Sequence, residues 1–172
     1  MRSFFPALAC FVGLLITVPA PAQPKPSPSS NCDKEKIEAF YRAYAKAFRS
    51  KDVNAIMAFY DPKELFVFDV TPPREYPNWD AYKKDWEDLF TMMPGPLDIN
   101  VSELAITVEG PVAYAHSIQT GYFTGKDGAR IDLAVRVSDV WHKVNGKWLI
   151  VQEHVSVPVD LATGKADLMS KP

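Results

Sequence analysis

The sequence predicts an α+β domain in which three N-terminal helices pack on a curled, mostly antiparallel sheet. Segments with helical periodicity fill the first half of the chain, and long strand-like segments fill the second half. An Asp-Gly and an Asn-Gly dipeptide mark hairpin turns in the second half. Helices gathered before a strand meander are typical of α+β folds. The 172 residues suffice for one domain.

Residues 1–22 predict a secretory signal peptide. Arg2 precedes an apolar run, residues 4–18, which is too short to span a bilayer, and the small residues of Ala20-Pro21-Ala22 suit a cleavage site. An uncleaved anchor is disfavoured because the run is short. A lipoprotein attached through Cys10 is disfavoured because almost no hydrophobic segment precedes that residue. The expected location is periplasmic or secreted, without membrane contact after cleavage.

The mature chain is predicted to have three parts. A Pro/Ser-rich linker covers residues 23–30, the domain covers residues 31–160, and a C-terminal tail covers residues 161–172. Cleavage would leave Cys32 as the one thiol, which either pairs between chains or stays free.

Three segments carry apolar residues at helical spacing. The first, residues 33–50, has a stripe of Ile37, Phe40, Tyr41, Tyr44 and Phe48. Asp52 and Asn78 each precede an apolar segment and predict the N-caps of a short second helix and of a third. The third helix has a stripe of Trp79, Tyr82, Trp86, Leu89 and Phe90.

Five strands are predicted, the first at residues 65–70. The other four run near residues 97–108, 112–124, 129–144 and 147–157. Two-residue loops at Asp127-Gly128 and Asn145-Gly146 would set the register, and register sets the face of each side chain. This count places Trp141 opposite Ile150, and Asp139 opposite both His116 and Gln152.

The same register predicts one face that points at the helices. Besides apolar residues it would carry a polar cluster of His116, Asp139, Gln152, His154 and Ser156. The opposite face would carry Arg136, Ser138, His142 and Glu153. Buried polar groups need partners, so the cluster is either a closed network that sets register or the lining of a cavity with shifted pKa values. No metal-ligand spacing or phosphate loop occurs, and no metal or cofactor is expected.

Asp69 is the leading candidate for proton chemistry. It ends the apolar segment 65–68, where burying a carboxylate without a partner is costly. The alternative is a solvated turn acid that caps the loop at residues 71–73.

Several of these segments resemble the nuclear transport factor 2-like superfamily and, more narrowly, its SnoaL-like and ketosteroid isomerase branch. They are residues 44–52, residues 67–69 with Asn78, residues 138–141 with the following Asn-Gly-Lys-Trp turn, and residues 153–158. The resemblance covers roughly residues 34–160. It implies a cone-shaped fold, and dimers are common among such proteins.

The resemblance also implies site residues. Ketosteroid isomerases use a tyrosine on the first helix, an aspartate base after the first strand and a sheet aspartic acid that donates to an oxyanion. These roles fall on Tyr44, Asp69 and Asp139. A protonated His116 opposite Asp139 would favour the ionised carboxylate, so Asp139 could instead orient His116 as an acid or base. His154 is a second candidate acid or a plain core histidine.

Two interpretations of function stay open. The first is an exported isomerase or cyclase, similar to ketosteroid isomerases or polyketide cyclases, that moves a proton next to a carbonyl of a hydrophobic small molecule. Its catalytic residues would be Asp69, Tyr44, His116 and Asp139. The residues predicted to contact the ligand are His154, Gln152, Ser156, Tyr114, Tyr122, Trp141, Phe68 and Trp86. The second is a non-catalytic ligand-binding or homodimerisation module. The net charge of −2 without a basic run argues against nucleic acid.

Overall fold

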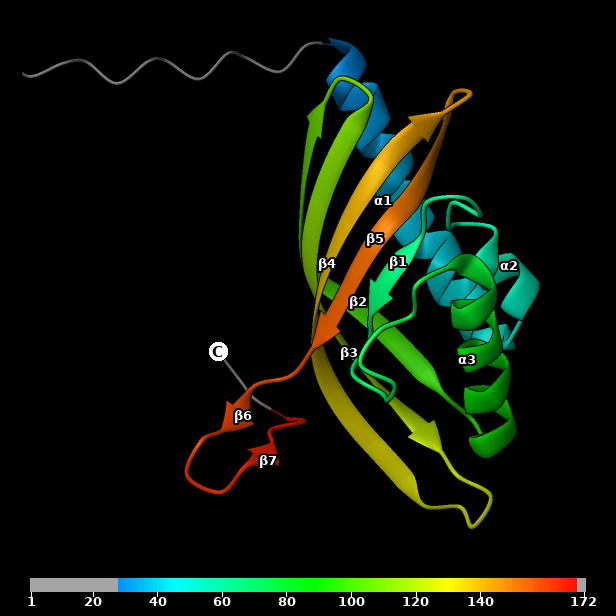
Figure 1. The fold of residues 1–172 in the computed structure, drawn as a ribbon, viewed down its shortest axis with the longest axis vertical. Helices are drawn as coiled ribbons and strands as arrows, with labels where there is room; N and C mark the ends of the chain where they lie inside the picture. The colour runs from blue at the N-terminus through cyan, green and yellow to red at the C-terminus, as the bar shows by residue number, and fades with distance from the viewer. Residues whose placement is uncertain (1–27, 170–172) are drawn as a thin grey trace, which may run out of the picture.

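The computed structural model describes residues 28–169 and places the helices on one side of a curled five-stranded sheet (Figure 1). The helices are α1 (Pro28–Ser50), α2 (Val53–Met57) and α3 (Trp79–Met92). The strands are β1 (Phe66–Phe68), β2 (Asp98–Glu109), β3 (Val112–Thr124), β4 (Arg130–Val144) and β5 (Lys147–Ser156). The sheet order is β1-β5-β4-β3-β2, with β1 parallel to β5 and the other pairs antiparallel. The predicted fold class is confirmed.

The predicted helix starts at Asp52 and Asn78 are confirmed. Each side chain accepts a hydrogen bond of 2.9 Å from a backbone N–H three residues later, which satisfies a donor that the first helical turn leaves free. Helix α1 begins at Pro28, inside the segment predicted as a linker. The predicted signal peptide lies outside the described residues. Within residues 28–169, no helix is long and apolar enough to cross a membrane, and Cys32 is an exposed free thiol.

The turn between β3 and β4 differs from its prediction by one residue. Gly125 and Ala129 pair through an N–H···O bond of 2.9 Å, and Gly128 between them has a φ of 78°. This is a three-residue hairpin loop with a glycine in the left-handed region. Because strand side chains alternate, the extra residue moves every β3 side chain to the other face. Ala115, rather than His116, therefore lies opposite Asp139.

A β-bulge at Val151 shifts the second half of β5. The predicted pair of Trp141 with Ile150 is confirmed, but the next pair joins Val140 to Gln152, so Val151 is the extra residue. Beyond the bulge the faces exchange. Glu153 takes the inner position, opposite Asp139.

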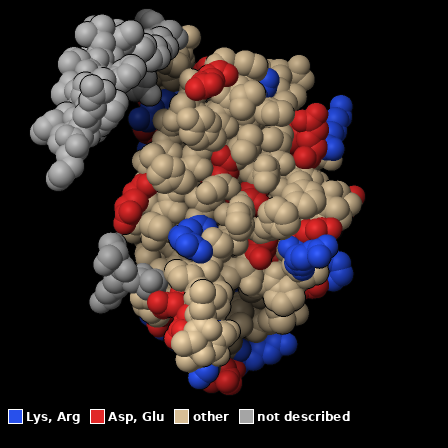
Figure 2. Space-filling model, turned by 60° about the vertical axis from the view of Figure 1, so that its left-hand side comes forward, with Lys and Arg blue, Asp and Glu red and all other residues tan. Residues whose placement is uncertain are grey.

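The outer face of the sheet, away from the helices, is partly apolar. On β3 it exposes Val112 and Tyr114, the latter 51% exposed. Figure 2 looks onto this side and shows a largely uncharged surface with acidic and basic side chains scattered over it.

The chain after β5 forms a small hairpin, β6 (Val159–Asp160) with β7 (Lys165–Ala166), that projects from the sheet (Figure 1). It then returns to β4, where the Ala134 N–H donates to the Leu168 carbonyl at 2.6 Å. Arg136 of β4 pairs with Ser156, the last residue of β5. Ala134 precedes Arg136 on β4, so the bond to Leu168 lies where β5 no longer covers this edge.

Candidate functional site

A cavity of about 300 Å³ lies between the helices and the inner face of the sheet. This volume is at the lower end for small-molecule sites. Its walls are mainly apolar and include Phe48 of α1, Leu89 of α3, Val137 of β4 and Leu168 of the C-terminal segment. The size and lining suit a compact hydrophobic ligand.

Asp69 lies at the wall of this cavity, directly after β1. Its Oδ2 accepts a hydrogen bond of 3.0 Å from the Tyr82 hydroxyl, and its Oδ1 accepts one of 2.5 Å from the Val70 N–H. Burial raises the pKa of Asp69, and these two hydrogen bonds oppose the rise. The Asp85 carboxylate nearby adds to the rise. Asp69 is thus a carboxyl group with a raised pKa on an accessible cavity wall.

Glu153, on β5, is a second acid at this wall. The Tyr82 hydroxyl contacts the carboxyl groups of both Glu153 and Asp69. Its side chain is buried and lines the cavity, and it contacts the hydroxyl groups of Tyr82 at 2.8 Å and Tyr60 at 3.0 Å. Burial raises the pKa of Glu153 well above its ordinary value, and the charge of Asp139 raises it further. Glu153 therefore keeps its proton to a higher pH than a surface glutamate does.

Asp139 lies behind Glu153 and does not line the cavity. It is 2% exposed, and the Tyr41 hydroxyl donates to its Oδ2 at 2.5 Å. The Oδ1 atom has no hydrogen-bond partner among the described residues. Burial raises the pKa of Asp139 to about 6. Two adjacent buried carboxyl groups resist joint ionisation, so the Asp139–Glu153 pair holds a proton.

Tyr44 reaches the cavity from α1. It is buried and lines the cavity beside Trp86, whose ring centroid lies 6.5 Å from its own. Burial, followed by the charge of Glu153, raises its pKa well above the ordinary value, so its hydroxyl remains a donor. Tyr44, Glu153, Tyr82 and Asp69 thus form a polar strip on the cavity wall. Tyr60 completes this strip through its contact with Glu153 but does not line the cavity itself.

The sequence-predicted site residues separate into two groups. Tyr44, Asp69 and Trp86 line the cavity, Asp139 lies one layer behind it, and Trp141 is fully buried against Phe40. The residues that do not line the cavity and take outward positions in the sheet register are Phe68, Tyr114, His116, Tyr122, Gln152, His154 and Ser156. Their predicted convergence on one pocket is wrong.

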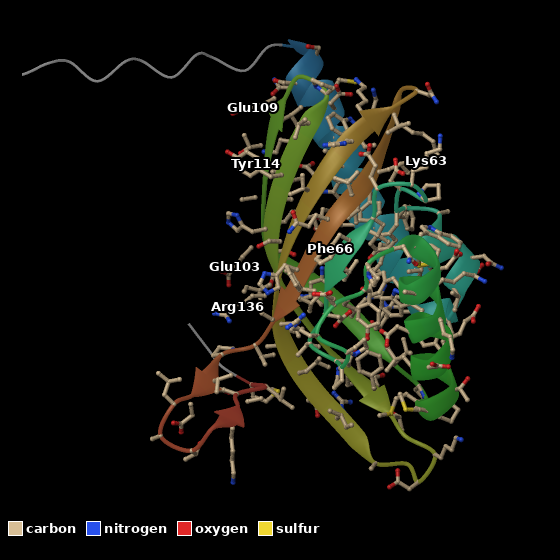
Figure 3. The ribbon with its side chains drawn as sticks, viewed as in Figure 1. Lys63, Phe66, Glu103, Glu109, Tyr114 and Arg136 are labelled. Atoms are coloured by element: carbon tan, nitrogen blue, oxygen red, sulfur yellow. The ribbon has the colours of Figure 1, made fainter. Side chains whose placement is uncertain are left out.

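Particular contacts show the outward group on the far side of the sheet. The rings of His154 and Phe68 are 5.6 Å apart, and the Tyr122 ring lies 3.7 Å from the Arg130 guanidinium. Tyr114 points away from the helices (Figure 3). The physical cause is the three-residue turn before β4 for the β3 residues, and the Val151 bulge for the β5 residues.

Three residues of the polar strip were missed. Tyr60 and Tyr82 fall on apolar helical segments, where a tyrosine is read as core. Glu153 falls on the opposite face when strict alternation is assumed. A signal for the bulge was present, because Leu149, Ile150 and Val151 are consecutive apolar residues and break the alternation of β5. Within residues 28–169, no three histidine, cysteine or acidic side chains are grouped as a metal ion would require.

A curled sheet closed by three helices over a cavity with acids and tyrosines defines a nuclear transport factor 2-like protein. The family model for the SnoaL-like domain matches residues 37–160. The chain therefore belongs to the SnoaL-like family, as its motifs predict.

Solved structures show the same architecture. A nuclear transport factor 2-like protein of unknown function from Pseudomonas putida is 25% identical, with a TM-score of 0.75 over 83% of this chain and 99% of that one. A nuclear transport factor 2-like superfamily protein from Salmonella enterica is 21% identical, with a TM-score of 0.68 over 80% and 99%. A ketosteroid isomerase-like protein from Erwinia carotovora is 21% identical, with a TM-score of 0.61 over 71% and 93%. No functionally curated protein matches the sequence.

Proposed function

We propose that this protein binds a hydrophobic small molecule that bears a carbonyl group and moves a proton next to that carbonyl, as a cofactor-independent isomerase or cyclase. The observation that carries this proposal is the Asp69–Tyr82–Glu153 arrangement at the wall of an apolar cavity. A SnoaL-like fold and a ketosteroid isomerase-like neighbour support the same class of chemistry.

The Tyr82 hydroxyl has one proton but contacts two acids. It can donate to only one of them, so the other contact needs a protonated carboxyl as the donor. The higher burial of Glu153 gives it that proton, and Tyr82 then donates to an ionised Asp69. This arrangement separates the roles of the two acids, since one is a base and the other an acid at the same pH.

In the proposed reaction Asp69 removes the proton from the carbon next to the ligand carbonyl. The negative charge that develops on the carbonyl oxygen accepts hydrogen bonds from the Tyr44 hydroxyl and the neutral Glu153 carboxyl. Asp69 then returns the proton to the ligand at the same or a neighbouring carbon. The apolar walls exclude water and strengthen these hydrogen bonds.

The test is proton exchange on a simple ketone that fits the cavity, with phenyl-substituted cyclohexanone as the probe in deuterated water. We expect Asp69→Asn to slow deuterium incorporation by roughly 100- to 10,000-fold, because it removes the base and keeps the shape. Ligand binding should change little. Asp132→Asn is the control, since Asp132 is an exposed acid that bonds to Arg130 and does not line the cavity.

The alternative is a ligand-binding module without catalysis. It is favoured by the hydrogen bond from Val70 to Asp69, which a structural turn acid would also make. Equal exchange rates in the wild type and in Asp69→Asn, with binding retained, would contradict the proposed catalysis and support the ligand-binding module. Circular dichroism of each variant separates a loss of chemistry from a loss of folding.

A further inference from the structure

Gln119 is a polar residue of the cavity wall that the proposed chemistry does not use. It lies on the inner face of β3, is 8% exposed and lines the cavity. Its carboxamide makes no hydrogen bond to another residue within the part of the chain that the structure describes. The polar atoms of this carboxamide are not sealed from the cavity, so they are available to hydrogen-bond a ligand that enters it.

The position of Gln119 along the sheet places it away from Glu153. Glu153 pairs with Asp139, and Asp139 pairs with Ala115, so these three residues lie on one level. Gln119 is four residues further along β3, which is about 13 Å at the usual rise of a strand. The cavity therefore has a polar group at each of two separated levels, joined by apolar walls.

The charges around the cavity restrict the ligand further. Its described lining contains four acids, Asp69, Asp85, Asp98 and Glu153, and no lysine, arginine or histidine. Asp98 is paired with Arg49, whose charge it offsets. A carboxylate or phosphate on the ligand would find no cation on these walls and would be repelled by the ionised acids.

We infer that Gln119 is a specificity-determining residue that hydrogen-bonds a hydroxyl or carbonyl at the far end of an elongated, uncharged ligand. The inference rests on the proposed function, because that function places the oxygen of the reacting carbonyl beside Glu153. A carboxamide both donates and accepts, so either oxygen group satisfies it.

Two matched probes test this inference. One is cyclohexanone with a phenyl group opposite the carbonyl, and the other carries an additional para-hydroxyl at the far end. We expect wild-type protein to bind the hydroxylated probe about 2- to 10-fold more tightly in calorimetry, the value of one neutral hydrogen bond. Gln119→Leu should abolish this preference and bind the plain probe at least as well. A third probe with a para-carboxylate should bind more weakly than both.

The control is Ser117→Ala. Ser117 is buried on the same face of β3, two residues away, and does not line the cavity. The Ser117→Ala variant should keep the preference for the hydroxylated probe. An equal preference in wild type and Gln119→Leu would overturn the role of Gln119 and leave the proposed function intact. Binding with the expected preference but without deuterium exchange would overturn the proposed chemistry alone. Failure of the plain and hydroxylated probes to bind would contradict both.

Discussion

Among single residues, the buried carboxyl groups of Asp139 and Glu153 have the largest effect on the chemistry available to the cavity. Neither has a basic partner in the hydrogen bonds and ion pairs of the described chain; their partners are the hydroxyls of Tyr41, Tyr60 and Tyr82. Hydroxyl donors ease the ionisation of a buried acid less than a cation would. The pair therefore stays protonated where surface acids ionise.

This protonation predicts a pH-dependent stability. A carboxyl whose pKa is raised in the folded state stabilises the protein fully below its ordinary pKa and loses that contribution as pH rises through the folded value. For Asp139 this pH window runs from the ordinary pKa of 3.8 to about 6. For Glu153 the window begins at the ordinary pKa of 4.5 and extends upward from there. The free energy of unfolding should fall over this window by roughly 1–3 kcal/mol for one such group.

Urea unfolding at a series of pH values checks this prediction. In Glu153→Gln the fall should be smaller, because one of the two coupled acids no longer titrates. Asp132→Asn, an exposed acid that bonds to Arg130, serves as the control and should keep the wild-type slope. Parallel curves for wild type and Glu153→Gln would show that Glu153 is not protonated in the folded protein.

At the scale of elements, the pairing of β2 with β3 depends on a close approach at Gly121. A Cβ on Gly121 would overlap the Asp98 carbonyl oxygen and lie 3.2 Å from the Ile99 Cα. Both are backbone atoms of the neighbouring strand, which cannot move as a flexible side chain can. Gly121 and Ile99 both line the cavity, so this close contact lies at the cavity wall.

Gly121→Ala should therefore push β2 away from β3. We expect it to lower the free energy of unfolding by about 1–3 kcal/mol, the usual cost of overpacking. Denaturant unfolding measures the change. The matched variant is Thr120→Ala, at the exposed neighbouring position, which should cost less than Gly121→Ala. If both variants unfold at the same urea concentration, the strands tolerate the added methyl group.

The elements also show what sequence reasoning could establish. Helical stripes, the Asp52 and Asn78 caps and the Asn145-Gly146 turn are encoded by adjacent residues, and the structure confirms them. The faces of β3 and β5 depend on single-residue differences in loop length and on a bulge. Because side chains alternate between the two faces of a sheet, an error of one residue assigns every following side chain of the strand to the wrong face. Tyr44, Asp69 and Trp86 were found because they lie on elements whose position does not depend on hairpin register.

At the scale of the whole molecule, the outer face of the sheet is the surface on which we predict a homodimer. Val112 and Tyr114 are exposed on this face, and Figure 2 shows uncharged surface with scattered charges on the side of the molecule that it draws. We expect light scattering to give the mass of a dimer for the wild type and of a monomer for Tyr114→Asp, which buries a charge in the interface. Leu161→Asp changes a residue of the β6–β7 loop that is 95% exposed and should leave the mass unchanged. A monomeric wild type would contradict this prediction.

Export is a second prediction for the whole chain. It rests on the residues before Pro28, which lie outside the described structure. Protein isolated from the native host should begin near Gln23, after removal of Met1–Ala22, and N-terminal sequencing measures this. An intact Met1 in the soluble fraction would contradict export.

The return of the C-terminal segment to β4 has a consequence for solubility. Where β5 ends at Ser156, the remaining edge of β4 would present backbone donors and acceptors that another chain could extend by strand addition. The bond between Ala134 and Leu168 occupies that edge with the protein's own backbone. Leu168 thus blocks strand addition at Ala134, in addition to forming part of the cavity wall.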